Sequence, residues 1–306
     1  MRPRSPRRTR VLSSVAVAAV VIAVVTIVVT ENRASVQQSV AAAANVGSFY
    51  LDIGASASLG FQPDGVVLHN GHRTNTGYAN DLVEIEAKKG VTLDLLQIGC
   101  PGETAQSMLS GGDACYTLPE RQLVRATTFL RENSDQTGLV TIDLGFNNVR
   151  TCLLPNLVDE ACATQGIDLV RNDMPLVLKD LQSAAGPQVH FVGLEYEDPY
   201  LGRYFASPNG VLDATESLQV ITQLNAVLAA VYANAGIPVA NVPGAFKSDN
   251  LTPTLLKGVD VPTNVADACR LTWFCTGYPY GPDDHPNNAG YLVIAQAIVA
   301  TLPPGL

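Results

Sequence analysis

The hydrophobic pattern of the chain alternates between two kinds of segment. Short runs rich in branched apolar residues predict strands at residues 48–53, 91–98, 138–144, 188–194 and 237–242. Between them, apolar residues at helical spacing predict helices at residues 79–89, 119–132, 167–184 and 212–235. A last helix is expected to follow Pro286 and to end near Leu302. Strands that alternate with helices indicate an α/β fold whose parallel sheet is covered by helices on both faces.

Residues 243–282 show neither the alternation of a strand nor the apolar spacing of a helix, so we expect a long loop there. Loops of that length are usually functional.

The chain has 306 residues, 47% of them hydrophobic, which is enough apolar material for one large core. Aromatic residues make up only 6%, so small and branched aliphatic side chains are expected to fill that core. Because no internal repeat and no further boundary is visible, residues 47–306 are predicted to form one domain.

The N-terminal segment predicts export. Residues 11–30 carry no charge, and at about 1.5 Å per residue they span roughly 30 Å, the thickness of a bilayer's hydrocarbon core. Five arginines within residues 1–10 place this end in the cytoplasm. Two alternatives remain open: an uncleaved signal anchor that holds the protein in the membrane, or a signal peptide cleaved near residues 41–44. The long apolar run favours the anchor. Residues 31–46 are polar and alanine-rich, and they are predicted to form a stalk.

The charge of the exported part argues against a nucleic-acid partner. The formal net charge of the whole chain is −9, and residues 1–10 contribute +5, so the remainder carries −14. Phosphate binding requires clustered lysine and arginine, which an acidic protein of this kind does not offer. We expect no nucleic-acid partner and a monomeric protein outside the cytoplasm.

The six cysteines all lie in the part of the chain predicted to be exported. An even number of cysteines in an oxidising compartment indicates disulfides. Their clustering favours pairing between neighbours, although other connectivities stay open at this point. The pairs would be Cys100–Cys115, Cys152–Cys162 and Cys269–Cys275. A zinc site is not expected, because the sequence has no C-x-x-C pair and only four histidines, and we expect no metal or other cofactor.

Four short segments carry the candidate chemistry. They offer a hydroxyl at Ser56, a backbone amide at Gly102, a carboxamide at Asn147 and an imidazole at His285. The first three directly follow predicted strands, and ligands of open parallel sheets bind outside the carboxyl ends of the strands. These groups are the ones needed to attack an acyl carbon and to stabilise the resulting oxyanion. Ser58 is the alternative nucleophile, but its position relative to the preceding glycine makes it the second choice.

His285 is the best candidate for a general base among the four histidines. His190 lies inside a predicted strand, which is typical of a core residue. His69 and His72 share a polar loop without nearby carboxylates, which argues against a metal pair. His285 directly precedes Pro286 at the start of the last predicted helix, so it is expected to be exposed and fixed.

At these residues the chain resembles the SGNH (GDSL) hydrolases, especially secreted, disulfide-bearing members of the actinobacterial type. The resemblance covers roughly residues 48–302 and rests on Ile-Gly-Ala-Ser at 53–56, Gly-Cys-Pro-Gly-Glu-Thr at 99–104, Thr-Ile-Asp-Leu-Gly-Phe-Asn-Asn at 141–148 and His-Pro-Asn-Asn-Ala-Gly-Tyr at 285–291. It implies a flavodoxin-like three-layer α/β/α fold and an esterase or lipase activity. It also implies that Ser56 is the nucleophile, that Gly102 and Asn147 are oxyanion donors, and that His285 is the base.

Three residues depart from the family pattern. Ala55 stands where the family usually has Asp, and Asn148 replaces the Asp that follows the motif Asn. The acid of the family normally lies three residues before the histidine, where this chain has Pro282. Asp283 is the nearest substitute, Asp284 is adjacent to the histidine, and the carbonyl of Pro282 is a further alternative for orienting it.

The sequence therefore predicts an exported serine esterase or lipase that works through a Ser56 acyl-enzyme. Two alternatives remain: an O-acyltransferase with the same site, and a catalytically silent binding or scaffold protein, which the altered residues motivate. The expected substrate is an ester, either a lipid or an acylated glycan. Loops at residues 197–209 and 243–282 are expected to form its acyl pocket, whereas the sequence does not indicate a chain length.

Overall fold

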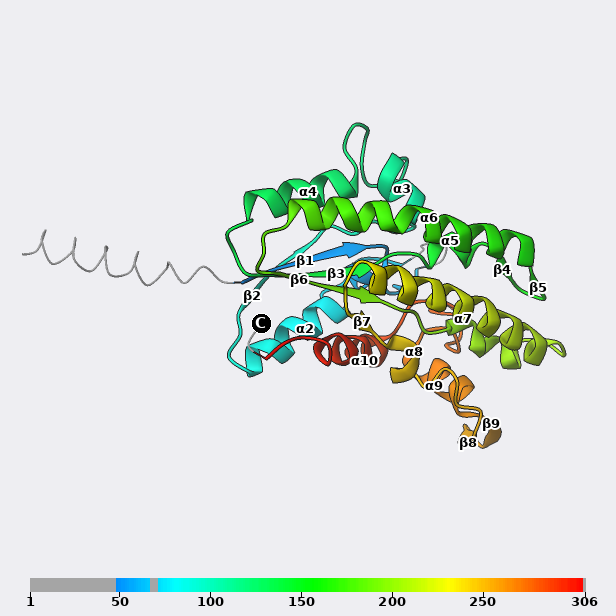
Figure 1. The fold of residues 1–306 in the computed structure, drawn as a ribbon. Coiled ribbons are helices and arrows are strands. Elements are labelled where there is room, and N and C mark those ends of the chain that lie inside the picture. The colour runs from blue at the N-terminus through cyan, green and yellow to red at the C-terminus, as the bar shows by residue number, and fades with distance from the viewer. Residues whose placement is uncertain (1–47, 67–70, 305–306) are drawn as a thin grey trace, which may run out of the picture. The chain divides into compact units, whose positions relative to one another are not determined.

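Five parallel strands form the central sheet of the computed structural model, which describes residues 48–66 and 71–304 (Figure 1). The strands are β1 (Ser48–Gly54), β2 (Leu93–Gln97), β3 (Gly138–Asp143), β6 (Val189–Leu194) and β7 (Val239–Ala240). Their order in the sheet is β2-β1-β3-β6-β7, and every pair is parallel. Each strand overlaps its predicted range. The central strands β1 and β3 are almost entirely buried, which explains why they read as continuous apolar runs.

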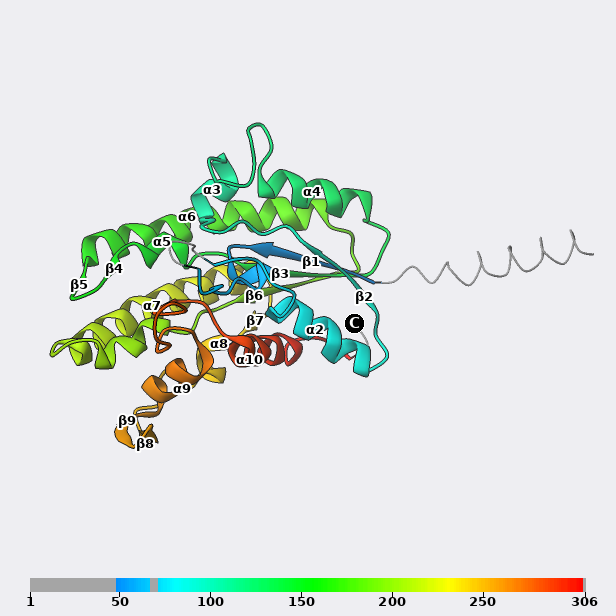
Figure 2. The same cartoon turned by 180° about the vertical axis from the view of Figure 1, so that it is seen from behind.

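Helices cover both faces of the sheet, as predicted (Figures 1 and 2). One face packs against α3 (Ala105–Ser110), α4 (Gln122–Glu132), α6 (Glu160–Ala184) and α7 (Gly210–Asn234). The other face packs against α2 (Tyr78–Lys88), α8 (Val242–Ala245) and α10 (Asn288–Val299). Alternate residues of β1 enter the two cores: Leu51 joins the first, and Tyr50 joins the second. This is the three-layer α/β/α arrangement that the resemblance implies.

Helices α4 and α6 begin three or more residues away from their predicted starts. Helix α4 begins at Gln122, so Pro119 lies before it rather than in its first turn. Helix α6 begins at Glu160, well before the predicted start at residue 167, because the Asp159 side chain caps it by accepting a hydrogen bond from the N–H of Cys162 at 3.0 Å. Polar capping residues extend a helix beyond the part that its apolar spacing reveals.

The prediction of a long loop at residues 243–282 is wrong. This segment contains most of α8, the antiparallel hairpin of β8 (Pro253–Leu256) and β9 (Val259–Pro262), and helix α9 (Thr263–Leu271). Lys257 and Gly258 turn the hairpin, with φ values of 51° and 84°. Two successive residues with positive φ are typical of the tight turns that match strand twist. Lysine is an uncommon first residue for such a turn, which is why the sequence pattern did not indicate it.

Smaller elements lie between the main ones. They are the turns η1 (Ala57–Leu59) and η2 (Pro199–Phe205), the short helix α5 (Asn147–Arg150), and a hairpin of β4 (Leu153–Leu154) and β5 (Leu157–Val158).

The six cysteines form three disulfides: Cys100–Cys115, Cys152–Cys162 and Cys269–Cys275. These are the three pairs that the clustering of the cysteines favours.

The predicted cytoplasmic tail, apolar span and stalk at residues 1–46 lie outside the described residues. Within residues 48–66 and 71–304, no helix has both the length and the apolar character needed to cross a membrane.

Candidate active site

The candidate residues meet at the point where the strand order reverses. From β1 the chain continues to β2 on one side, whereas β3, β6 and β7 follow one another on the other side. In a doubly wound sheet, ligands bind at this switch point, outside the carboxyl ends of the strands. Ser56 follows β1, and Asn147 follows β3, its direct neighbour in the sheet. The topology therefore brings these two side chains to the same edge.

The turn that carries Ser56 requires a glycine at its start. Gly54, the last residue of β1, has a φ of 140°, and a Cβ atom there would lie 2.0 Å from the carbonyl oxygen of Asp143. Only glycine fits that conformation and that close approach. Ser56 then enters the short turn η1 with a partly exposed side chain.

Three side chains form a hydrogen-bonded chain at this edge. Nε2 of His285 lies 2.8 Å from Oγ of Ser56, and Nδ1 of the same ring lies 2.8 Å from Oδ1 of Asp283. The backbone N–H of His285 also donates to Oδ1 of Asp283, at 3.0 Å. The ring is thus aligned between a hydroxyl and a carboxylate, which is the geometry of a nucleophile with an oriented base.

The backbone around His285 is fixed by the segment before helix α10. The carbonyl of His285 accepts a hydrogen bond from the N–H of Trp273 at 3.0 Å. Asn287 caps α10 by accepting hydrogen bonds from the N–H groups of Ala289 and Gly290. The ring itself packs beside Phe61, with 5.2 Å between the ring centroids. These contacts, of which the one with Phe61 comes from a distant part of the chain, hold the imidazole in one place.

The electrostatic surroundings favour the protonated form of His285. Burial alone would lower its pKa, but the hydrogen bond to Asp283 and the charges of Asp283 and Asp284 outweigh this effect. The pKa of His285 is therefore raised above its ordinary value of 6.5. An imidazole with a raised pKa holds a proton more readily, which is the property required of a base.

Asp284 makes a different set of contacts. Arg150 binds its two oxygens from Nε at 2.6 Å and from Nη2 at 3.1 Å, and the hydroxyl of Tyr200 donates to it at 2.8 Å. Burial would raise the pKa of Asp284, but the hydrogen bond from Arg150 and the nearby positive charges hold it below its ordinary value. Asp284 is thus a constant negative charge, with Oδ1 at 3.7 Å from Nδ1 of His285.

Ser58, the alternative nucleophile, is fully buried. Its hydroxyl donates to the carbonyl of Ala55 at 2.7 Å, and its N–H donates to Oδ2 of Asp143 at 3.0 Å. Ser58 therefore serves the structure of the turn, and the hydroxyl that faces the imidazole of His285 is that of Ser56.

The two candidate oxyanion donors lie in the same cleft as Ser56. Gly102 has a φ of 86°, which favours glycine, and its backbone is exposed. The side-chain amide of Asn147 donates one hydrogen bond to the carbonyl of Glu103, at 3.1 Å. An amide carries two N–H donors, so a second one is left for a ligand.

The residues that depart from the family pattern have structural partners here. Oδ1 of Asn148 accepts a hydrogen bond at 3.0 Å from the N–H of Ala105, at the start of α3. Because residue 55 is alanine, the turn has no carboxylate at that position. The buried carboxylate of Asp143, at the end of β3, accepts a hydrogen bond from the N–H of Ser58 in this turn. In place of an acid at Pro282, the carboxylate of Asp283 is the acceptor for the imidazole.

The cleft around Ser56 has a volume of about 670 Å³, within the usual range for small-molecule sites. A second groove of about 760 Å³ adjoins it, and the two share the wall residues Pro155, Arg203, Phe274 and Pro282. Apolar side chains such as Phe205, Leu256 and Val259 line this groove, and parts of both predicted loops, residues 197–209 and 243–282, contribute to it. The apolar groove therefore borders the cleft.

The donor atoms that could bind a metal are already engaged. Among the described residues, Asp283, Asp284 and His285 bring three ligand atoms within 4.8 Å of one another. Nδ1 of His285 bonds to Asp283, and Asp284 bonds to Arg150. A second group contains Cys100 and Cys115, whose sulfurs form a disulfide rather than thiolates.

Sequence reasoning missed several residues of this site. Arg150 lies one helical turn after Asn147 on α5, a spacing that places both side chains on one face and could have indicated its role. Tyr200 lies in the loop expected to form the acyl pocket, but its hydrogen bond to Asp284 was not predicted. The buried Asp143 and Glu103 lie within the motifs without an assigned role, and Gln122 gave no signal, because their contacts form only between distant segments.

Comparison with solved structures supports the fold. The structure matches an extracellular lipase from Streptomyces rimosus with a TM-score of 0.52 and 19% sequence identity. The match covers 82% of this chain and 100% of the lipase. It matches a phospholipase A1 from Streptomyces albidoflavus over 83% of this chain and 100% of the other, with a TM-score of 0.52 and 20% identity. No protein-family model and no curated protein matches the sequence. The chain has the SGNH hydrolase fold, as its motifs imply.

Proposed function

We propose that the protein is an exported serine hydrolase that cleaves carboxylic esters. The observation that carries this proposal is the hydrogen-bonded chain from the hydroxyl of Ser56 through the imidazole of His285 to the carboxylate of Asp283. The lipase and the phospholipase A1 that share the fold are ester hydrolases by name, which supports it. Three disulfides support an oxidising compartment outside the cytoplasm.

The reaction proceeds in two halves. Oγ of Ser56 attacks the ester carbonyl carbon while Nε2 of His285 takes the hydroxyl proton. The backbone N–H groups of Ser56 and Gly102 and the amide of Asn147 stabilise the oxyanion. The carbon–oxygen bond of the ester then breaks, the leaving alcohol takes the proton from His285, and an acyl-enzyme remains.

Water completes the cycle. His285 removes a proton from the attacking water, and the acyl–Ser56 bond breaks as the proton returns to Oγ of Ser56. The products are the free acid and the restored serine. An alcohol in place of water would give acyl transfer, so product analysis with an added alcohol separates hydrolase from transferase.

The substrate is an ester with an extended apolar chain. The groove that adjoins the cleft is lined by apolar side chains, and burial of each methylene stabilises binding by about 0.8 kcal/mol. This groove favours a lipid ester over an acylated glycan, because Phe205, Leu256 and Val259 would bury an acyl chain against apolar surface. Charged side chains, among them Arg203 and Lys257, also lie in its wall.

The test compares two neighbouring serines. We expect Ser56→Ala to abolish both turnover of p-nitrophenyl esters and labelling by a fluorophosphonate, with an unchanged fold. Ser58→Ala is the matched control, and it should retain labelling because its hydroxyl bonds to Ala55 within the turn. Equal labelling of wild type and Ser56→Ala would contradict the proposal.

A further inference from the structure

The side chain of Gln122 pairs with the backbone of the strand that leads to Ser56. Oε1 of Gln122 accepts a hydrogen bond from the N–H of Gly54 at 2.6 Å, and its Nε2 donates to the carbonyl of Gly54 at 2.9 Å. Gln122 is fully buried at the first position of α4. A side-chain amide thus continues the hydrogen bonding of β1 two residues before the candidate nucleophile.

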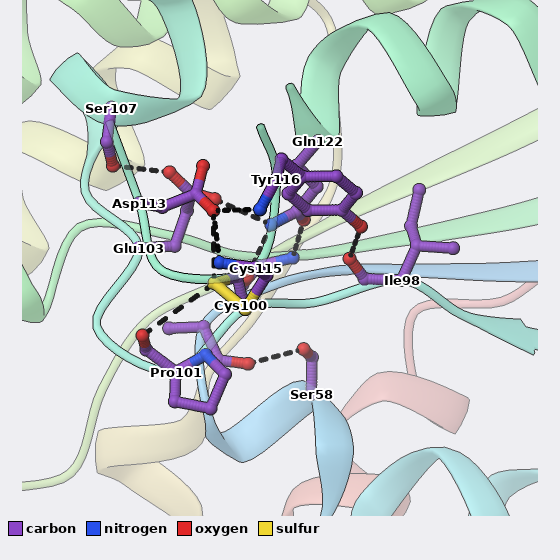
Figure 3. Close-up of a disulfide and its surroundings, with 12 residues drawn as sticks. Ser58, Ile98, Cys100, Pro101, Glu103, Ser107, Asp113, Cys115, Tyr116 and Gln122 are labelled. Atoms are coloured by element: carbon purple, nitrogen blue, oxygen red, sulfur yellow. Dashed lines mark hydrogen bonds between the residues drawn. A yellow bond between two sulfur atoms is a disulfide. The ribbon is translucent and has the colours of Figure 1, made fainter. Parts of the chain in front are cut away.

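The same amide reaches a buried carboxylate. Nε2 of Gln122 also donates to Oε2 of Glu103 at 2.9 Å, and the hydroxyl of Ser107 donates to Oε1 (Figure 3). Glu103 is fully buried beside the Cys100–Cys115 disulfide. Burial raises the pKa of Glu103 to about 7, although the hydrogen bonds from Ser107 and Gln122 oppose this increase. A neutral group is therefore well tolerated at this position.

Glu103 contacts both candidate oxyanion donors through its main chain. It directly follows Gly102, and its carbonyl accepts the hydrogen bond from the amide of Asn147 at 3.1 Å. Its own N–H donates to the carbonyl of Cys100 at 3.0 Å, which closes the turn around Gly102. Movement of Glu103 would therefore displace the two donors together.

We propose that the Glu103–Gln122 pair is a positioning device that holds the oxyanion donors at a fixed distance from the Ser56 turn. This inference rests on the proposed function, because the donors matter only if an oxyanion forms. Its physical basis is that Gln122 links Gly54, on the nucleophile side, to Glu103, on the donor side, through one buried amide. Displacing catalytic groups by about 1 Å costs up to about 100-fold in rate.

The test separates positioning from stability. Gln122→Met keeps the length of the side chain and removes its hydrogen bonds, and we expect kcat to fall by about 10- to 100-fold with little change in KM. Leu130→Ala is the control, because Leu130 is buried in the same helix, and its loss lowers stability without touching Gly54 or Glu103. This control should keep the kcat of the wild type per folded molecule.

A conservative variant provides the rescue. In Glu103→Gln the side-chain oxygen still accepts from Gln122, and the amide donates to the hydroxyl oxygen of Ser107, so we expect a kcat within about threefold of wild type. Glu103→Leu should show the loss seen for Gln122→Met. If Gln122→Met and Leu130→Ala lower the melting temperature alike and neither changes kcat, the positioning inference is overturned.

A second measurement does not depend on turnover. In Gln122→Met, the backbone amides of residues 100–107 should exchange with deuterium faster than in Leu130→Ala. The two variants are compared at temperatures that lie equally far below their own melting temperatures. Equal exchange in the two variants would overturn the inference. A wild-type protein without ester turnover would contradict only the proposed function, and the exchange comparison would still decide whether the pair holds this loop.

Discussion

One oxygen of Asp283 accepts two hydrogen bonds from His285. Oδ1 receives the backbone N–H at 3.0 Å and lies 2.8 Å from Nδ1 of the ring. Because the residues are two apart in the chain, the carboxylate and the imidazole belong to one tight turn before Pro286. The carboxylate thus orients both the backbone and the ring, although it occupies a different position from the acid of the family pattern.

The first prediction concerns this carboxylate. Asp283→Asn retains the shape of the side chain but removes the charge that orients Nδ1–H and stabilises the imidazolium. We expect kcat for a p-nitrophenyl ester to fall by about 100-fold or more, while fluorophosphonate labelling becomes slower rather than absent. A kcat within threefold of wild type would contradict a role for the charge of Asp283 in orienting the imidazole.

The second prediction is a pH profile. His285 acts as a base in its neutral form, and its pKa is raised above 6.5, so kcat/KM should rise with pH through a midpoint above that value. The hydrogen bond to Asp283 contributes to this increase, so the midpoint of Asp283→Asn should move to lower pH. Rates measured between pH 5 and 9 check both statements. A midpoint that moves to higher pH in the variant would contradict them.

The main architecture was predictable because it depends on local patterns. The five strands are short apolar runs, and the longer helices between them show regular apolar spacing, so these elements were visible by themselves. The short helices α3 and α5 were not predicted. Ser56, Asn147 and Gly102 were predicted as candidates because each lies shortly after a predicted strand, and parallel strands end at one edge. His285 was predicted as the candidate base from its place before Pro286 and the small number of histidines.

The remaining parts depend on contacts between distant segments. The hairpin of β8 and β9 turns at Lys257, and helix α9 packs against Leu201 and Ala214, which no local pattern in residues 243–282 indicates. Gln122 has the sequence appearance of an ordinary helix residue, yet its amide pairs with Gly54. Such roles follow from tertiary packing, which the sequence of one segment does not contain.

The third prediction concerns the Cys100–Cys115 disulfide, which closes a loop of 15 residues that contains Gly102. Cross-links of this length stabilise folded proteins by about 3 kcal/mol in the chain-entropy model. Replacing both cysteines with serine should lower the free energy of unfolding by about that amount, measured by urea denaturation. It should also reduce kcat, because the Gly102 turn loses its brace.

The control for this prediction is the Cys152–Cys162 disulfide. It closes a loop of similar length, 10 residues, that does not include Gly102. Its removal should cost similar stability but leave kcat per folded molecule closer to that of wild type. Equal loss of kcat in both double variants would show that stability, rather than the Gly102 turn, accounts for the effect.

The last prediction tests the apolar groove beside the cleft. If it holds the substrate's chain, kcat/KM for p-nitrophenyl esters should increase with acyl length, because each buried methylene adds up to about 0.8 kcal/mol. Phe205→Asp places a charge in the groove wall and should lower kcat/KM for the decanoate by about 10- to 100-fold, while the acetate, which is too short to reach the groove, is unaffected. Leu251→Asp is the matched control, since Leu251 is also an exposed apolar residue but does not line the groove. Equal loss for acetate and decanoate in Phe205→Asp would place the chain elsewhere.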